Sequence, residues 1–470
     1  MEGPSINRPL KLSLWSCDWD DCKRPAVQRA GNCSLCNKHL CRTHLRDKWH
    51  ECPKPEENWS MYASQYVAAE THQMDELCRR IDGAKLCARA SLCRGGIPCT
   101  VNLSANNLSS MMGGQNCHAE ITFGDNVKWL ARFRLSNISS PPLECRDYIL
   151  RSEAATMDFL QKRTHIPSPK IFDWACESDP SNPLGRVSYI LMEKMEGNPL
   201  DWQGANPSQK EKVMQQLVDI FLEIEKHPFD TMGSIVLNND LTRYEIQGIA
   251  HHEVYCVGTT GPLGPFHSSL EGADALIGLY LAMIASGEIE ATYPIDVFLM
   301  HRFRLDLLND IGKHAPSGGP FFLKHPDDKG DHILVNEDFD IVGMIDWEWC
   351  QIVSKDNAFS SPCMMWPVAK FYAGSNELAE EELRLAMIFR ERGREDIAKY
   401  ILEGRKVQRF FFALGAGSGS HNDRTTMIDL FMGLKRAFNS GEEEWEEWRA
   451  KALVRWEEDE LLQILLQRNT

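Results

Sequence analysis

The sequence lacks two features that would each assign it to a broad class of proteins. No apolar run reaches the roughly 18 residues that a transmembrane helix needs, and the longest candidate, residues 275–287, predicts a buried helix. Basic residues are not in excess either, since 51 Lys and Arg stand against 67 Asp and Glu, a net charge of -16. We therefore expect neither a membrane protein nor a general nucleic-acid-binding protein.

The amino-terminal residues also lack the charged and apolar regions of a signal peptide. In a reducing compartment the 16 cysteines would favour metal binding over disulfide bonds. We expect a cytoplasmic protein that could also enter the nucleus. The 470 residues, of which 43% are hydrophobic and 25% charged, are typical of a globular chain with one large domain and one small domain, or with about three domains.

Cysteine and histidine residues cluster near the amino terminus with the spacing C-x4-C-x10-C-x2-C-x4-C-x2-H-x5-H-x-C. The eight residues are Cys17, Cys22, Cys33, Cys36, Cys41, His44, His50 and Cys52. They suffice for two tetrahedral zinc ions, and because protein ligands fill every position, the zinc would be structural. A segment of about 50 residues builds little core, so metal would supply much of its folding free energy.

This spacing closely resembles the AN-one-type zinc finger. The resemblance implies one zinc ion held by Cys17, Cys22, Cys41 and His44, and another held by Cys33, Cys36, His50 and Cys52. His39 is a further histidine that could compete. Residues 1–60 carry a net charge of +2, from 10 basic and 8 acidic residues, which argues against nucleic-acid binding. Because similar fingers bind proteins, we expect a protein partner instead.

The rest of the chain predicts a small strand-rich lobe followed by a larger helical lobe, an α+β bilobal fold. The predicted elements are a helical region at 62–92 interrupted at Gly83, strands at 118–123, 128–135 and 187–192, a helix at 147–163, mainly helix from 208 onward, a hairpin at 333–346 and an acidic helix at 441–467. The expected domains are the finger at 1–60, a helical linker or extension at 61–104, the small lobe at 105–195 and the helical lobe at 196–470.

Carboxylates gather on either side of the predicted hairpin at 333–346. Asp327 lies on a polar loop before it, and Asp346 follows its second strand. If the two strands pair, their outer ends meet and bring His332 close to Asp346. Converging carboxylates suit a divalent metal and a general base.

At this point the chain resembles the aminoglycoside phosphotransferase family, most closely its fungal members, over roughly residues 105–440. The family has a protein-kinase-like fold, a His-Gly-Asp catalytic loop with an Asn five residues after the Asp, and an Ile-Asp-Trp or Ile-Asp-Phe metal site. The resemblance implies that Asp327 is the catalytic base and that Asp346 holds the Mg²⁺ that bridges the nucleotide phosphates. His325 would brace the loop.

The chain departs from the family pattern at two positions. His332 replaces the metal-binding Asn, although Mg²⁺ prefers oxygen ligands. Asp331 could supply an oxygen, or one metal could suffice. Pro326 replaces Gly, and Asp328 is a rival base. These departures keep open an alternative, a catalytically inactive, pseudokinase-like interaction protein.

The same resemblance places the nucleotide site. Arg132 would replace the usual Lys on the third strand, with Arg134 as the alternative, and Glu153 would be its helix partner. Gly114, in the loop at 113–116, could cover the phosphates, although a full Gly-x-Gly-x-x-Gly is absent. The hinge would include Glu193 and Met195, and His332 would lie beside the bound nucleotide.

Together these features predict an ATP-dependent phosphotransferase that acts on a hydroxyl group of a small molecule. The expected cofactors are ATP, Mg²⁺ and two structural zinc ions. Because residues after 60 carry a net charge of -18, from 41 basic and 59 acidic residues, a cationic acceptor would suit the helical lobe.

Overall fold

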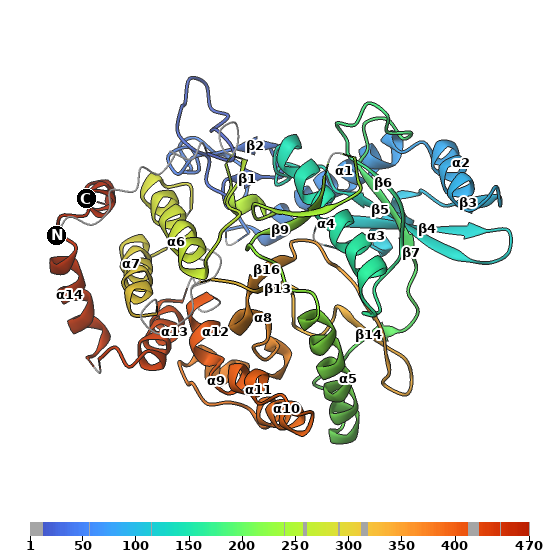
Figure 1. Ribbon diagram of the computed structural model, residues 1–470. Helices are drawn as coiled ribbons and strands as arrows, with labels where there is room; N and C mark the ends of the chain where they lie inside the picture. The colour runs from blue at the N-terminus through green and yellow to red at the C-terminus, as the bar shows by residue number, and fades with distance from the viewer. Residues whose placement is uncertain are drawn as a thin grey trace.

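The structure is a computed structural model that describes residues 13–469, apart from 56, 114, 239, 257–260, 290–291, 312–317, 412–422 and 442. A strand-rich lobe lies at the right of Figure 1, helices fill the left and lower parts, and the cysteine-rich segment lies near helix α6 at the top. In that segment, β1 (Asn32–Cys33) and β2 (Lys38–His39) form a short antiparallel pair.

The small lobe is built on an antiparallel sheet of five strands in the order β3-β4-β5-β7-β6. Its strands are β3 (Cys99–Val101), β4 (Asn116–Phe123), β5 (Lys128–Arg134), β6 (Ile171–Ala175) and β7 (Tyr189–Glu193). The hairpin expected at 118–135 is confirmed as β4 and β5. Alternate residues of β4 are buried, as expected for a strand whose two faces differ.

Three helices cover the outer face of this sheet: α1 (Trp59–Arg80), α2 (Gly83–Cys93) and α3 (Ala105–Ser110). The interruption expected at Gly83 is confirmed, because the Asp82 side chain accepts a hydrogen bond from Lys85 N and begins α2 there. The segment at 61–104 is therefore helical, but it packs as an extension of the small lobe rather than as a linker. It also supplies the edge strand β3, which the sequence did not predict.

Helix α4 (Leu143–Arg163) packs against the opposite face of the sheet, and confirms the helix expected at 147–163 with an earlier start. Ala155, Met157 and Leu160 contribute to the same core as Ile190 and Met192 of β7. The Thr164 hydroxyl donates to Leu160 O at the end of the helix, and Pro167 and Pro169 follow. The helix thus holds its acidic residues against the strands whose arginine side chains are the candidate phosphate-binding groups.

The two lobes are joined by a short sheet. β8 (Asn198–Pro199) follows β7 and pairs with β14 (Ile333–Val335), which pairs with β15 (Ile341–Met344). The hairpin expected at 333–346 is confirmed, and Ile345 N donates to His332 O at 2.9 Å beyond its last strand pair. The connection between the lobes therefore lies directly beside the loop and turn that carry Asp327 and Asp346.

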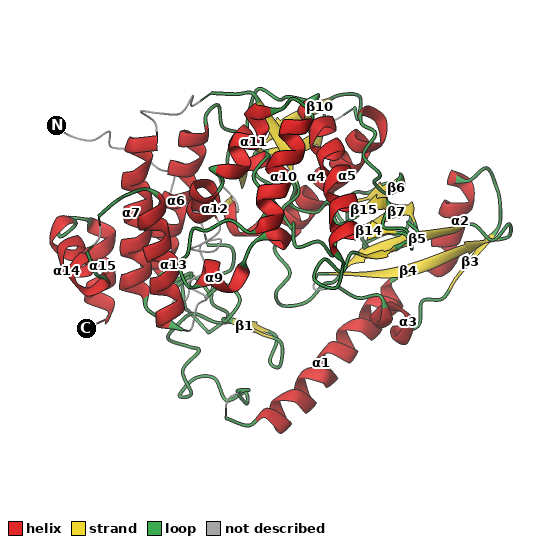
Figure 2. Cartoon of the chain, turned by 90° about the horizontal axis from the view of Figure 1, so that it is seen from below, coloured by secondary structure: helices red, strands yellow, loops and turns green. Residues whose placement is uncertain are grey.

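The large lobe is mainly helical, as expected. Its helices are α5 (Pro207–Glu225), α6 (Ser269–Ser286), α7 (Pro294–Ile311), α8 (Lys355–Ala358), α9 (Val368–Tyr372), α10 (Glu380–Glu391), α11 (Glu395–Leu402), α12 (Arg405–Phe411), α13 (Arg424–Ala437), α14 (Trp445–Arg455) and α15 (Glu460–Asn469), with 3-10 turns η1 (His252–Val254) and η2 (Cys363–Met365). The α+β bilobal fold predicted from the sequence is confirmed, and Figure 2 shows the sheet of the small lobe with α1, α2 and α3 at the right and α6, α7, α13 and α14 of the large lobe at the left.

The sequence missed several short strands of this lobe and was wrong about its tail. Among the described residues, three antiparallel pairs besides β14 and β15 break the helical region: β9 (Ser234–Leu237) with β10 (Tyr244–Gln247), β11 (Tyr255–Cys256) with β12 (Gly261–Pro262), and β13 (Phe321–Lys324) with β16 (Gln351–Ser354). The acidic tail is two helices, because the Asp459 side chain accepts hydrogen bonds from Leu461 N and Leu462 N and begins α15 anew.

Helix α6 is long and apolar enough to cross a membrane by length and composition, and it is longer than residues 275–287 indicated. In the structure 56% of its apolar window is buried inside the protein. It packs beside α7 and α15, and Ile277, Leu281 and Ile284 share a core with Phe298 of α7. Its burial is that of a core helix.

Candidate active site

A buried ion pair joins the sheet of the small lobe to α4. Both Nη atoms of Arg132 on β5 contact the carboxylate of Glu153, and Nη2 does so at 2.6 Å from Oε2. The Glu153 side chain is only 2% exposed and the Arg132 side chain 9%. The two residues expected to fix the nucleotide phosphates are thus brought together, and Arg132 rather than Arg134 is the partner of Glu153.

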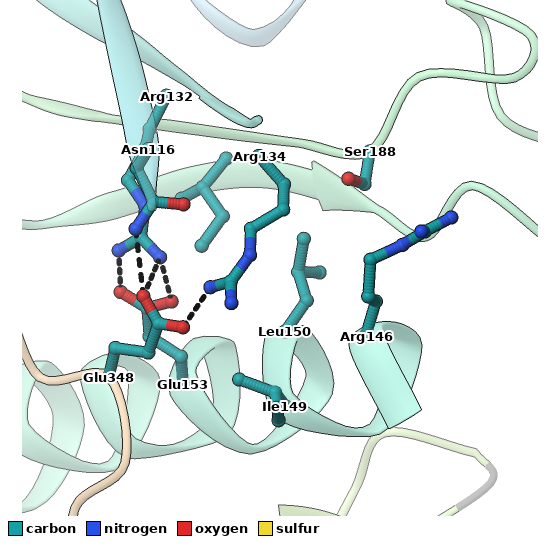
Figure 3. A pocket seen from close by; sticks show the side chains of 10 residues that line it. Asn116, Arg132, Arg134, Arg146, Ile149, Leu150, Glu153, Ser188 and Glu348 are labelled. Carbon is teal, nitrogen blue, oxygen red and sulfur yellow. Dashed lines mark hydrogen bonds and ion pairs between the residues drawn. The ribbon is translucent and has the colours of Figure 1, made fainter. Parts of the chain in front are cut away.

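A third charged group, which the sequence analysis did not assign, completes this cluster. Glu348 lies between both arginines, with its Oε2 at 3.0 Å from Arg132 Nη2 and its other oxygen bonded to Arg134 Nη1. Asn116 Nδ2 donates to the same Oε2 at 2.8 Å. Figure 3 shows the Glu348 carboxylate between the two guanidinium groups, with Glu153 next to it on α4.

Burial and neighbouring charges shift the pKa values of this cluster. Burial raises the pKa of Glu153, Arg132 opposes the rise, and the Glu348 carboxylate adds to it. Burial disfavours the charged form of Arg132, but its carboxylate neighbours outweigh burial and raise its pKa. Because a guanidinium keeps its proton in proteins, we take the Arg132–Glu153 pair as ionised. The Asp346 carboxylate adds to the rise of both pKa values, to a smaller extent than Glu348 does.

Asp327 lies on the loop between β13 and β14, where its side chain is 39% exposed and its Oδ2 is 3.1 Å from Lys329 Nζ. Asp328, the rival base, pairs with Lys324 at 3.6 Å, and its backbone oxygen accepts a hydrogen bond from Met364 N at 3.1 Å. Asp327 is therefore the more accessible carboxylate of the two. Lys329 was not assigned from the sequence.

His325 ties this loop to the turn that carries Asp346. Asp327 N donates to His325 Nδ1 at 3.2 Å, so Nδ1 is the accepting nitrogen and Nε2 donates to Ile345 O at 3.0 Å. Burial lowers the pKa of His325, which agrees with a neutral ring. The bracing contact expected of this residue is present, because it holds the backbone on both sides of the site.

His332 is buried against His325, with ring centroids 4.1 Å apart and planes inclined by 20°. Burial lowers the pKa of His332 to about 2, so the ring is neutral. Its Nδ1 is buried without a hydrogen-bond partner among the described residues. The position expected to carry a metal-binding Asn thus presents a neutral ring that packs against His325 of the loop that carries Asp327.

Asp346 is exposed at the end of the hairpin and has a left-handed backbone, with φ of 62°. The next residue, Trp347, is fully buried, and its Nε1 donates to Met344 O at 2.8 Å. The anchored tryptophan therefore fixes the turn and leaves the Asp346 carboxylate toward solvent. Non-glycine residues with such a backbone are uncommon and often lie at functional sites.

The expected hinge residues lie at the end of β7 and just after it. Glu193 pairs with Trp129 of β5, and its backbone N donates to Lys170 O at 2.8 Å. Met195 packs near Gly343 of β15. Gly114 lies outside the described residues, and the neighbouring Gly113 N donates to Asn116 O at 2.8 Å.

Among the described residues, ligand atoms of Cys, His, Asp and Glu converge within 4.8 Å of one another in two groups, both in the amino-terminal segment. They are Cys17, Cys22, Cys41 and His44, and Cys33, Cys36, His50 and Cys52. These are the two quartets that the finger resemblance implied. The carboxylates around Asp346 form no third group, so a Mg²⁺ there would need phosphate oxygens and water as further ligands.

The spacing within the quartets fits zinc. Four ligands about 2.3 Å from a tetrahedral ion lie about 3.8 Å apart. Cys22 Sγ is 3.9 Å from Cys41 Sγ, and Cys36 Sγ is 3.7 Å from His50 Nε2. Burial, followed by the neighbouring cysteines, raises the pKa of Cys52 to about 12, a crowding of thiols that a bound cation would relieve.

The finger packs on the rest of the chain. Arg29 Nη2 is 2.6 Å from Glu253 Oε1, and Gln28 Nε2 is 2.9 Å from Glu288 Oε1. His39, the possible competing ligand, instead lies 2.8 Å from Ile138 O through Nε2 and stacks on Trp15. It therefore contributes to docking and belongs to neither quartet.

Comparisons with known proteins find sequence similarity over only part of the chain. No protein-family model matches the chain. A subtelomeric hrmA-associated cluster protein of Aspergillus fumigatus is 32% identical over 109 residues, which cover 23% of this chain and 21% of that protein. The altered inheritance of mitochondria protein 9, mitochondrial, of Saccharomyces cerevisiae is 32% identical over 123 residues, 24% of this chain and 19% of that protein. The chain thus spans about a fifth of the length of these curated relatives.

Solved structures were matched over longer stretches at low identity. A Ralstonia eutropha protein assigned to the aminoglycoside phosphotransferases is 14% identical with a TM-score of 0.45, over 76% of this chain and 99% of that chain. The ethanolamine kinase of Plasmodium vivax is 14% identical with a TM-score of 0.38, over 70% of this chain and 80% of that chain.

Proposed function

We propose that the chain is an ATP-dependent phosphotransferase that acts on a hydroxyl group of a small molecule. The observation that carries this proposal is the buried Arg132–Glu153 pair, which also bonds Glu348, two residues after Asp346. His325 links the backbone at Asp327 to the residue before Asp346, so a base and a metal ligand are held on adjoining segments. This set of groups can bind phosphates, hold a cation and accept a proton.

In the proposed reaction Asp327 accepts the proton of the acceptor hydroxyl. The hydroxyl oxygen forms a bond to the terminal phosphorus of ATP as the bond between that phosphorus and ADP breaks. Arg132 and Lys329 would offset negative charge on the phosphates, and Asp346 would hold Mg²⁺. Bound magnesium would supply positive charge next to the phosphate oxygens. Adenine would contact the backbone near Glu193 and Met195.

The test is transfer of phosphate from Mg-ATP to a panel of amino sugars, amino alcohols and neutral sugars by the zinc-loaded chain. We expect Asp327→Asn to lower turnover by about 100-fold or more, because a positioned general base contributes on that order. Asp338→Asn is the matched control, since Asp338 is an exposed carboxylate in the turn between β14 and β15 and has no part in the proposed reaction. Equal turnover of the two variants, or no transfer by folded wild-type protein, would refute the proposal.

A catalytically inactive interaction protein is a second candidate. The observation that favours it is His332, which places a buried ring where the family resemblance implies an oxygen ligand. The finger, which we propose holds two structural zinc ions at residues 1–60, would contribute the partner-binding surface. This candidate predicts partner capture that Asp327→Asn and Asp346→Asn both leave unchanged.

We keep cytoplasmic location as a proposal. The name of the yeast relative places that protein in mitochondria. Imaging of the tagged full chain tests this proposal. Cytosolic, nuclear and mitochondrial markers imaged alongside it show in which of the three compartments the protein lies.

A further inference from the structure

Glu348 lies where both candidate phosphate-binding arginines direct their guanidinium groups. It bonds Arg132 and Arg134 at the same time, one through each carboxylate oxygen. Its side chain is only 3% exposed. With Glu153 it makes a set of two carboxylates and two guanidinium groups, so the charges of the cluster balance without any ligand.

The space beside this cluster is too small for a nucleotide. The cavity lined by Asn116, Arg132, Arg134, Glu153 and Glu348, with residues of α4 and β7, has a volume of about 20 Å³. That volume holds about one water molecule. A triphosphate could not contact Arg132 and Arg134 while Glu348 occupies the place between them.

One arginine of the cluster can nevertheless donate a further hydrogen bond. Arg134 Nε is buried without a hydrogen-bond partner among the described residues. A guanidinium carries five N–H donors and matches phosphate oxygens well. Glu348 therefore leaves Arg134 Nε unsatisfied, a donor that would serve phosphate oxygens once Glu348 has withdrawn.

We propose that Glu348 is an internal stand-in for the nucleotide phosphates. It holds Arg132 and Arg134 in position when no nucleotide is bound, and it has to withdraw before phosphates reach them. The proposal rests on the proposed function, because it assumes that phosphates bind at Arg132. Glu348 thereby sets the affinity for the charged part of the nucleotide without affecting recognition of the base.

The geometry allows such a withdrawal from a fixed turn. Glu348 lies between Trp347, which is anchored on Met344, and Trp349, whose ring packs edge-on against His251 with centroids 5.2 Å apart. Because both flanking tryptophans are held, the backbone at Glu348 is anchored, and we assign the withdrawal to rotation of the Glu348 side chain. Asn116 is the uncharged group that holds Glu348 in place, through its 2.8 Å hydrogen bond.

The experiment is calorimetric titration of ADP and of adenosine, without magnesium, into the zinc-loaded full chain. Glu348→Gln removes the competing charge but keeps the shape of the side chain. We expect it to bind ADP about tenfold or more tightly than the wild type, because charge-assisted hydrogen bonds to both arginines become available. Adenosine, which has no phosphate, should bind both proteins equally.

Two further variants make the outcome decisive. Asn116→Ala preserves every charge and loosens Glu348, so it should tighten ADP binding to a smaller extent, even if Glu348→Gln does not fold. Asp173→Asn is the matched control, since Asp173 accepts hydrogen bonds from Arg89 at 2.6 and 2.7 Å on the far side of the small lobe. It should bind ADP as the wild type does.

Unchanged or weaker ADP binding by the folded Glu348→Gln and Asn116→Ala variants would overturn the proposal. Mg-ATP binding by the wild type, measured in the same series, tests the proposed function separately. If the wild type binds Mg-ATP and neither variant tightens ADP binding, only the role of Glu348 fails. If no form binds any nucleotide, both proposals fail.

Discussion

His325 is the residue that joins the two halves of the candidate active site. It accepts a hydrogen bond from Asp327 N and donates one to Ile345 O. Without the His325 ring, Asp327 N and Ile345 O would lose these hydrogen bonds. The position of Asp327 relative to Asp346 therefore depends on one imidazole ring, and this dependence can be measured.

We predict that His325→Phe lowers both stability and turnover. The aromatic ring keeps its contact with His332, but both hydrogen bonds are lost, at a cost of about 2 kcal/mol in the free energy of unfolding. A loop that no longer holds Asp327 should lose about tenfold or more in turnover. Urea unfolding and the phosphate-transfer assay measure the two effects.

The control for this prediction is His72→Phe, on the exposed surface of α1, where the His side chain is 70% exposed. It should change neither property. Wild-type stability and turnover of His325→Phe would mean that the loop and the turn are held by other contacts.

The sequence predicted most of the residues of the site but not all of their partners. Arg132 and Glu153 could be paired in advance, because their places on a strand and on a helix restrict where each side chain can lie. Glu348 and Lys329 could not, although each lies two residues from a predicted site residue. Whether a side chain after a turn points inward depends on backbone angles such as the left-handed φ of Asp346, which sequence patterns do not specify.

Helices of the large lobe are joined by carboxylates that each form ion pairs with two basic side chains. Glu225 at the end of α5 contacts Arg394 before α11 and Lys355 of α8, the latter at 2.6 Å. Arg394 and Lys355 also bind Asp396 of α11, with Lys355 at 3.2 Å. This cluster connects three helices that are far apart in the sequence.

We predict that Glu225 stabilises the protein in a pH-dependent way. The hydrogen bond from Arg394, more than any other cause that favours ionisation, lowers the pKa of Glu225. The unfolded value is about 4.3. A lowered pKa in the folded state means that the stabilisation is complete above the unfolded pKa and is lost as the pH falls through the folded pKa.

The test compares Glu225→Gln with the wild type in urea unfolding. The variant should lose about 1–2 kcal/mol at pH 7, and the difference should shrink steadily below about pH 4. Glu245→Gln, which removes an exposed pair with Arg243, should have little effect at either pH. A difference that does not depend on pH would exclude the charge as its origin.

At the scale of elements, helices and longer strands were predicted more reliably than short strands. Strand β4 alternates buried and half-buried residues over eight positions, which is enough to be recognised, whereas β9 and β10 span four residues each. In the carboxy-terminal tail, the sequence pattern instead joins two helices that are separate in the structure. Its apolar spacing continues across Trp456–Asp459, and only the cap at Asp459 divides α14 from α15.

The whole molecule combines the bilobal body with a finger that packs against it. Arg29 and Gln28 contact the glutamates Glu253 and Glu288 in segments of the large lobe, and His39 contacts Ile138 in the small lobe. The segment with the two Cys/His quartets thus contacts both lobes. Part of the surface of this segment therefore contacts the two lobes.

We predict two zinc ions per chain, held independently. Cys41→Ser should release the ion of the first quartet, and Cys36→Ser that of the second, so each variant should retain one ion. Metal analysis of the purified protein gives the counts. Loss of the first ion should also alter tryptophan fluorescence, because Trp19 stacks on His44 with ring centroids 5.0 Å apart.

Cys87→Ser, outside both quartets, should retain both ions. Retention of two ions by Cys41→Ser, or loss of both ions from either quartet variant alone, would contradict two separate zinc sites.

The central claim is that the molecule binds a magnesium nucleotide between its lobes through Asp346. The most direct measurement is calorimetric titration of Mg-ATP into the zinc-loaded wild type and into Asp346→Asn, with Asp338→Asn at the exposed tip of the same hairpin as the control. We predict saturable binding by the wild type and the control, and a loss of about 100-fold in affinity for Asp346→Asn. No binding by the folded wild type, or equal binding by all three proteins, would contradict the account.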